Sequence, residues 1–239
     1  MSTDWGALAT TLTEALHLEM PPVAITFTEE RLDGVRGFDG PMSEPAADGR
    51  KGRASAGCVF WTHATTGTFS TAPEDHGNCS VGSFTHGLKS LAEVAGNDDV
   101  SALLTSGWVT MDMVPGIPTV SKKPASIVYG PLVESTVDPD VVLVRVNGRQ
   151  LMVLSDAIPG LRIEGKPQCH IVAVAKEQGV AAASVGCALS RARTGMQPYE
   201  MTCAIPANDL PDVASRVQAT AEVDGVVAKY AARDARRFA

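Results

Sequence analysis

The stretch Val141-Val142-Leu143-Val144-Arg145-Val146 is almost continuous in β-branched and aliphatic residues. Such a run is typical of a strand buried on both faces, because a strand with one solvated face alternates apolar and polar residues. Asn147 follows at once and can cap a helix over residues 148–157. The stretch therefore predicts a central strand that leads directly into a helix.

Segments on both sides of this stretch extend the pattern. Residues 3–18 carry apolar side chains at helical spacing, and Pro21-Pro22 ends that helix before a predicted strand at 23–27. Further strands are expected at 68–71, 126–129 and 201–205, and further helices at 58–64, 80–88, 90–104 and 169–178. Strands and helices in this order predict the α/β class (mixed α+β), with a mixed sheet flanked by helices.

No repeat, linker or block of like charges divides the chain, so a single domain over residues 1–239 is expected. Within it, the Gly-, Pro- and Asp-rich composition of residues 31–56 predicts a long surface loop. Residues 208–237 are expected to form a C-terminal helical segment, with a helix over 209–219 and an amphipathic tail over 221–237. That tail can pack on its own core or on a partner subunit, so a homodimer is one expectation.

Composition limits the partners. The 239 residues are 44% hydrophobic and 20% charged, as in a globular protein, and 27 acidic against 20 basic residues give a net charge of −7. Such a balance offers no cationic face for phosphates, so nucleic acid is not an expected partner. The first residues carry an acid where a signal peptide would carry Lys or Arg, so secretion by that route is not expected. No apolar stretch reaches the ~20 residues of a membrane-spanning helix. A cytoplasmic protein with reduced thiols and no membrane partner is expected.

Five cysteines stand out against this background, and none forms a C-x-x-C pair. Glycine or proline lies close to Cys79, Cys169 and Cys187, and several of these cysteines precede predicted helices. Small neighbours let backbone amides approach sulfur, and a helix start favours the thiolate. Iron–sulfur sites need both conditions, although a free cysteine also serves as a small core residue. Cys203, inside a predicted strand, fits that structural role best.

Other chemistry-bearing residues lie near the cysteines. His76 precedes Cys79 by three residues, His170 is adjacent to Cys169, and Arg191 follows Cys187. A neutral imidazole can ligate a metal or transfer a proton, and arginine can bind a carboxylate or phosphate in bidentate fashion. The same residues could equally be turn or helix-surface groups. Phosphate-binding loops, the G-x-S-x-G elbow and the H-E-x-x-H pair are all absent, so nucleotide and common hydrolase chemistries have no support.

Several short blocks occur in an order that resembles the uncharacterised ArCR family, domain of unknown function 169. They are Pro21-Pro22-Val23-Ala24-Ile25; Asp75-His76-Gly77-Asn78-Cys79; Gly130-Pro131-Leu132; Asp138-Pro139-Asp140; Gln150-Leu151-Met152; Gly186-Cys187 with Ser190-Arg191; and Ile205-Pro206. The resemblance spans about residues 20–220. It implies one mixed α/β domain in which Cys58, Cys79, Cys169 and Cys187, but not Cys203, belong to the family pattern.

One departure from that pattern lies beside a cysteine. Where the family usually reads Gly-Cys-x-Gly-x-Arg, this chain has Gly186-Cys187-Ala188-Leu189-Ser190-Arg191. Leu189 therefore replaces a glycine and narrows the space beside the sulfur of Cys187.

These observations lead to the hypothesis of an iron–sulfur protein whose four-iron (4Fe-4S) cluster is held by three or four of Cys58, Cys79, Cys169 and Cys187. An enzyme is one form of this hypothesis, with redox, Lewis-acid or sulfur-transfer chemistry on a small molecule and with His76, His170 and Arg191 as acid, base or anchor. A small-molecule substrate or a redox partner is then expected. The alternatives are a metal-free cysteine redox or sulfur-transfer protein, and a non-catalytic ligand- or zinc-binding domain.

Overall fold

The chain is described from a computed structural model that covers residues 3–40, 57–165 and 167–238. One seven-stranded sheet in the order β2-β3-β1-β4-β7-β6-β5 forms its centre. All described strand pairs are antiparallel except β5 with β6. The strands are β1 (Val23–Thr28), β2 (Phe69–Thr71), β3 (Ser126–Pro131), β4 (Val141–Val146), β5 (Arg162–Glu164), β6 (Ala182–Ser184) and β7 (Met201–Pro206).

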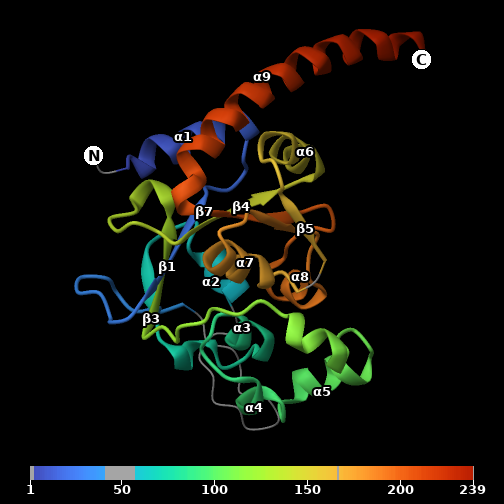
Figure 1. The fold of residues 1–239 in the computed structure, drawn as a ribbon. Coiled ribbons are helices and arrows are strands. Elements are labelled where there is room, and N and C mark those ends of the chain that lie inside the picture. The colour runs from blue at the N-terminus through green and yellow to red at the C-terminus, as the bar shows by residue number, and fades with distance from the viewer. Residues whose placement is uncertain (1–2, 41–56, 166, 239) are drawn as a thin grey trace.

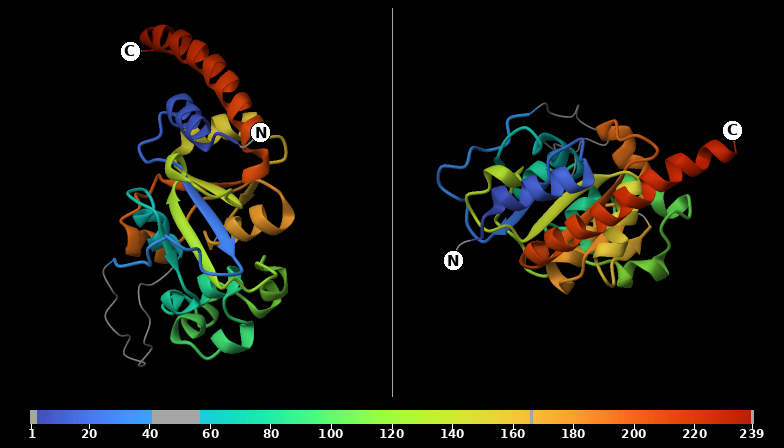
Figure 2. Two further views of the ribbon diagram at one scale, coloured as in Figure 1. Left: turned by 90° about the vertical axis from the view of Figure 1, so that its left-hand side faces the viewer. Right: turned by 90° about the horizontal axis from the view of Figure 1, so that it is seen from above.

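Helices cover the sheet on both faces (Figures 1 and 2). On one face lie α1 (Trp5–Leu16), α6 (Gly148–Ala157) and α9 (Leu210–Asp234). On the other face lie α2 (Gly57–His63), α7 (His170–Gln178) and α8 (Ala188–Thr194). The mixed α/β class and the mixed sheet flanked by helices, both expected from the sequence, are confirmed.

The alternation along β4 explains how one sheet serves two cores. Val142 and Val144 pack with α1, α6 and α9, whereas Val141 and Leu143 pack with α2 and α7. Because successive side chains point to opposite faces, a strand buried on both sides must be apolar at nearly every position. The continuous run of Val and Leu is therefore explained, and the expected helix after Asn147 is present as α6.

A group of short helices lies beyond the second face, at the bottom of Figure 1. It comprises α3 (Ser80–Thr85), α4 (Leu91–Val94), α5 (Asp98–Thr105) and the 3-10 helix η2 (Met111–Gly116). The 3-10 helix η1 (Pro73–His76) leads into it from β2. Neither α5 nor η2 contains a fully buried residue, so their apolar side chains do not belong to either main core.

The local structure differs from the expectations in some details. The segment expected to be helical over 90–104, with a break allowed at Gly96-Asn97-Asp98, forms two helices, α4 and α5, on either side of that break. The helix and tail predicted over 209–219 and 221–237 form one continuous helix, α9, followed by a 3-10 turn at Ala235–Arg237. Strands β5 and β6 and helix α8 were not expected. Residues 41–56 of the predicted loop lie outside the described residues.

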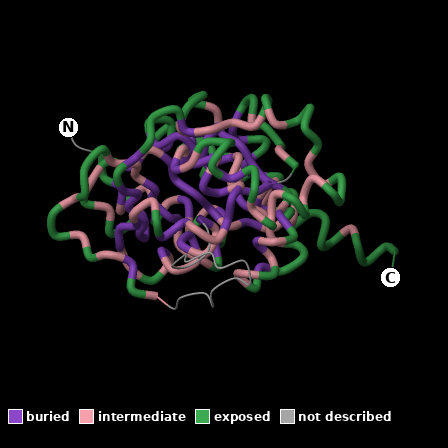
Figure 3. The backbone as a smooth tube through the Cα atoms, turned by 90° about the horizontal axis from the view of Figure 1, so that it is seen from below, coloured by how far each residue is buried: buried purple, intermediate pink, exposed green. Residues whose placement is uncertain are grey.

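The end of α9 leaves the body of the protein. Burial is concentrated in the sheet and the helices packed on it, while the C-terminal half of α9 is largely exposed (Figure 3). Only Leu210, Val213, Ala214 and Val217 of this helix are buried. Within the described residues, no helix has the length and apolar character to cross a bilayer.

Candidate functional site

Four of the five cysteines meet in one pocket. Cys58 is the second residue of α2, and Cys79, Cys169 and Cys187 stand immediately before α3, α7 and α8. All four line the same small cavity of about 30 Å³. The cysteines lie up to 129 residues apart in the sequence, since 187 − 58 = 129. The fold therefore gathers four thiols, each at the start of a helix, where the peptide dipoles favour negative charge.

The rest of the cavity wall is mainly apolar or small. Leu189 and Ser190 of α8 stand beside Cys187, and Gly82 of α3 stands beside Cys79. The further lining residues are Gly57, Trp61, Val81, Trp108, Pro167, Gln168 and Arg193. Two tryptophans and a leucine thus restrict water around the sulfur atoms, as a redox or ligand-binding centre needs.

Burial and the neighbouring sulfurs raise the pKa of two of these thiols, Cys58 and Cys169. Burial raises the pKa of Cys58 to about 11, with the neighbouring sulfurs of Cys79 and Cys187 adding to the effect and a hydrogen bond with Ser190 opposing it. Burial also raises the pKa of Cys169 well above its ordinary value, again reinforced by Cys79. Four such groups can ionise together only when positive charge compensates them.

Arg193 supplies one positive charge at the cavity. Its side chain donates a hydrogen bond to the thiol of Cys79 and lies near Cys58 and Asp99. Burial works to lower the pKa of this guanidinium, but the sulfur atoms and Asp99 outweigh burial, so the pKa is raised. Arg193 also reaches the carbonyl oxygen of Asn78, at 3.5 Å. It is the arginine that faces the thiols.

Backbone and side-chain donors complete the surroundings of the sulfur atoms. The amide of Gly82 donates a hydrogen bond of 3.4 Å to Sγ of Cys79. Hydrogen bonds of this kind are one means by which proteins stabilise thiolate sulfur. Gln168 donates to the hydroxyl of Thr202 at 2.8 Å, while its own side-chain oxygen is buried with no partner among the described residues.

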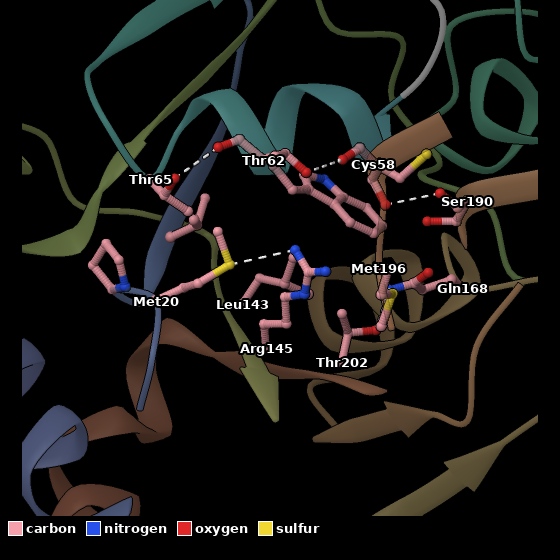
Figure 4. Close-up of a pocket in the computed structure, with 14 residues that line it drawn as sticks. Met20, Cys58, Thr62, Thr65, Leu143, Arg145, Gln168, Ser190, Met196 and Thr202 are labelled. Atoms are coloured by element: carbon pink, nitrogen blue, oxygen red, sulfur yellow. Dashed lines mark hydrogen bonds between the residues drawn. The ribbon is translucent and has the colours of Figure 1, made fainter. Parts of the chain in front are cut away.

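A second small cavity, also of about 30 Å³, adjoins the first through residues that line both, namely Cys58, Trp61, Gln168 and Ser190. Figure 4 shows Cys58 and Ser190 at one side of this cavity and Met20 at the other. Arg145 contacts Met20 there and is paired with Glu200 at 2.7 Å. Because that charge is already compensated, the second cavity extends the thiol pocket without adding a free cation.

The predicted histidines do not line the thiol cavity. His76 is 1% exposed, and its Nε2 lies 3.0 Å from the hydroxyl of Thr71, with its ring 4.7 Å from that of Phe60. Burial lowers the pKa of His76 well below its ordinary value, and nearby His86 contributes to the shift. His76 is therefore not the exposed turn group that the sequence allowed, and His86 is buried beside it.

His170 and Arg191 are placed differently. His170 begins α7 next to Cys169, and its buried Nε2 has no partner among the described residues. Arg191 instead donates to the carbonyl oxygens of Val185, Gln197 and Glu200. It therefore fixes the loops around α8, while Arg193, two residues later, faces the sulfur atoms.

Cys203 lies away from this site. It is fully buried in β7 among the residues that pack with α1, α6 and α9, on the opposite face of the sheet from α2 and α7. Burial raises its pKa to about 12. Cys203 is a core residue, as its strand position indicated.

The spacing of the thiols differs from that of a site for a single ion. Within the part of the chain that the structure describes, no three His, Cys, Asp or Glu side chains come together closely enough to hold one metal ion. The four cysteines share a cavity without forming the compact tetrahedron that zinc requires.

Comparison with protein families gives one result. The family described as uncharacterised ArCR, domain of unknown function 169, matches residues 11–216. No curated protein and no solved structure matches the chain.

Proposed function

The chain belongs to the uncharacterised ArCR family, and for this member of it we propose an iron–sulfur protein whose four-iron (4Fe-4S) cluster is bound by Cys58, Cys79, Cys169 and Cys187. The observation that carries the proposal is the convergence of four thiols from four helix starts on one cavity. Complete ligation by four cysteines favours electron transfer, with a small molecule or another redox centre as the partner.

The raised pKa values of Cys58 and Cys169 argue against these two thiols as metal-free nucleophiles. A cysteine that attacks a disulfide or carries sulfur needs a substantial thiolate fraction near neutral pH. In this pocket the pKa of Cys58 is about 11 and that of Cys169 is also raised. A cationic iron–sulfur core reverses this balance, because it compensates several thiolates at once.

A single zinc ion and a four-iron cluster place different demands on the positions of four sulfurs. Zinc draws four sulfurs to about 2.3 Å from one centre, whereas a four-iron cluster is larger and holds its ligands farther apart. The described residues contain no group arranged for a single ion. The cavity of about 30 Å³ has room for roughly one or two water molecules, so cluster binding requires its wall to move outward.

The chain's own residues would tune such a centre. Arg193 offsets negative charge beside Cys79, and the amide of Gly82 donates to the same sulfur. Trp61, Trp108 and Leu189 limit the access of water. A protein of this chemistry needs reduced thiols, and we therefore propose the cytoplasm as its location.

Anaerobic expression with iron, followed by iron and acid-labile sulfide analysis, tests the proposal. We expect about four irons and four sulfides per chain and a broad visible absorption band. Replacing Cys58, Cys79, Cys169 or Cys187 singly by Ser should reduce the iron content. The matched control is Cys203→Ala, which removes the remaining thiol from the opposite face of the sheet and should leave the iron content unchanged.

Three other outcomes would overturn the proposal. Colourless protein without sulfide after reconstitution would remove the cluster. Stoichiometric zinc, with unfolding on chelation, would favour a structural metal site. One preferred disulfide after mild oxidation, in protein that takes up no iron, would favour cysteine redox chemistry.

A further inference from the structure

A much larger cavity of about 620 Å³ lies on the other side of Val81 and Pro167, which line both it and the thiol pocket. The short helices α3, α4, α5 and η2 form most of its wall. The apolar residues that face it are Val81, Phe84, Leu91, Val94, Ala95, Val100, Leu103, Leu104, Val109, Met111, Met113, Val114, Ile117, Pro118 and Pro167. Its volume lies in the range of cavities that bind small organic molecules, roughly 300–1,000 Å³.

This cavity explains why α5 and η2 contain no fully buried residue. Val100, Leu103 and Leu104 of α5 are apolar, yet no residue of α5 is fully buried. These side chains line the cavity instead of packing into a core. A helix whose apolar side chains line a hollow of this size is typical of a binding site for an apolar molecule.

The polar groups of the cavity carry no unpaired positive charge. Arg162 is paired with Glu164 and also donates to Gln178 at 2.6 Å. Asp112 is exposed at the wall. An anionic ligand would therefore find no free cation here, and an uncharged ligand is favoured.

One polar atom remains available at the end nearest the thiols. Nε2 of His170 is buried without a hydrogen-bond partner among the described residues, and His170 follows Cys169 directly in the chain. A neutral imidazole nitrogen can donate to a carbonyl oxygen or accept from a hydroxyl group. Nε2 is shielded from water in the empty cavity, so the ring must turn toward the cavity to meet a ligand oxygen. That hydrogen bond would satisfy a buried group that otherwise costs free energy.

We propose that this cavity binds an uncharged, largely apolar organic molecule through a carbonyl or hydroxyl oxygen at His170. This inference rests on the proposed function only where it names the bound molecule as the small molecule that reaches the thiol centre. Binding itself depends only on the cavity, so it can be measured on iron-free and on iron-loaded protein.

Displacement of the neutral fluorophore Nile red by two ligands of the same shape tests this inference. Benzophenone has a carbonyl oxygen, and diphenylmethane has none. We expect saturable binding of one Nile red per chain, and displacement by benzophenone at about fivefold lower concentration, the ratio that one net hydrogen bond gives. His170→Phe should bring that ratio close to one while Nile red still binds.

Two acidic substitutions separate this site from general surface adsorption. Leu103→Glu places a charge in the cavity and should weaken Nile red binding at least tenfold. Met152→Glu, the matched control, changes an exposed residue of α6 on the opposite face and should have no effect.

Equal loss in both variants, no saturable binding, or a ligand ratio unchanged in His170→Phe would overturn the inference. A dimer that Leu103→Glu dissociates would show that protein, not a small molecule, covers the cavity, and would also overturn it. Normal binding to iron-free protein that takes up no iron would leave this inference standing and overturn only the proposed function.

A second inference rests on α9. The part of this helix that extends from the body carries an exposed apolar row of Val223, Val226, Val227 and Tyr230. These residues are spaced three, four and seven apart and so share one face of the helix. Each is 57% exposed or more. A helix that projects such a row into water is a candidate for helix–helix association.

The charges beside this row select a second copy of the chain in antiparallel orientation. Glu222 precedes the row, and Lys229 and Arg233 lie toward the other end of the same flank. Asp224 is already paired with Arg149 of α6. An antiparallel pair brings this flank of one copy against the same flank of the other, so that Glu222 of each copy comes close to Arg233 of its partner.

We infer that the protein forms a homodimer through two antiparallel α9 helices. Light scattering after gel filtration should give twice the mass of the chain, and Val226→Glu should give a monomer, with Met152→Glu as the control. Glu222→Arg should weaken the dimer about fivefold, and adding Arg233→Glu should restore it. A monomeric wild-type protein, or a double exchange that fails to restore the dimer, would overturn this pairing.

Discussion

The guanidinium of Arg193 donates a hydrogen bond to the thiol of Cys79, which joins helix α8 to the start of α3. This contact places a permanent positive charge beside a proposed cluster ligand. Replacing Arg193 by Gln keeps a hydrogen-bond donor but removes the charge. Because reduction adds an electron, we expect a reduction potential on the order of 40 mV more negative, equivalent to about 1 kcal/mol. An anaerobic redox titration measures this shift. Arg193→Lys, which keeps the charge, should stay close to the wild type; the same shift in Lys and Gln variants would contradict an electrostatic cause.

Arg191 should behave in the opposite way. Its three hydrogen bonds go to backbone oxygens of Val185, Gln197 and Glu200, and none goes to a sulfur atom. Arg191→Gln leaves these carbonyl groups without their donor, so we expect a loss of about 1–3 kcal/mol in the free energy of unfolding by urea. The reduction potential of the variant that still folds should be unchanged. A shifted potential with full stability would mean that Arg191 acts on the centre itself.

Gly57 allows α2 to start against the ring of His86. A Cβ atom at Gly57 would lie 2.6 Å from Cε1 of His86, which is fully buried. That ring is held between Phe27 and Trp61 and cannot move away freely. Gly57→Ala should therefore cost about 1–3 kcal/mol of stability in urea unfolding and lower the iron content, because Cys58 is the next residue. Gly96→Ala, at a position with open space, is the control and should change stability by less than about 0.5 kcal/mol. Full stability of Gly57→Ala would show that α2 can shift.

Much of the fold was predictable because its signals are local. The run Val141–Val146 had to be a strand with two buried faces, and Asn147 then capped α6 through a hydrogen bond from the amide of Gln150. Strand β5 could not be predicted in this way. It has only three residues, two of them exposed, and it gains its strand conformation from pairing with β6. Long-range pairing of this kind leaves no periodic pattern in the sequence.

The sequence could predict which cysteines form the candidate site, but it could not predict which charged side chain faces them. Cysteines beside glycine and before helices could be singled out, and the fold brings those four together. Arg191 and Arg193 both follow Cys187, and only the orientation of the short helix α8 decides which one faces the thiols. The burial of His76 and His86 likewise depends on aromatic residues from distant strands, which a local pattern cannot show.

The buried histidines should make the protein sensitive to acid. Burial lowers the pKa of His86 to about 4, and it lowers that of His76 well below the ordinary value near 6.5. The unfolded chain therefore binds more protons than the folded protein between pH 6.5 and about 4, so stability falls as pH falls through this window. Full protonation of His86 alone corresponds to at most about 3 kcal/mol. Urea unfolding at pH 7, 6, 5 and 4.5 measures the slope, and His86→Leu should make it shallower. An unchanged slope would show that His86 does not contribute.

Leu189 should control access to the thiol pocket. It lines the cavity beside Cys187 and Ser190, at the position where the family pattern usually has glycine. Leu189→Ala removes much of that wall, while alanine keeps α8 helical better than glycine would. We expect the iron content to be unchanged and the loss of iron to a chelator to become several times faster, because water and small solutes reach the sulfur atoms more easily. The rate is read from the decay of visible absorption under anaerobic conditions. Leu91→Ala makes the same deletion in the wall of the large cavity and should leave the rate unchanged. Equal rates in both variants and the wild type would show that Leu189 does not shield the centre.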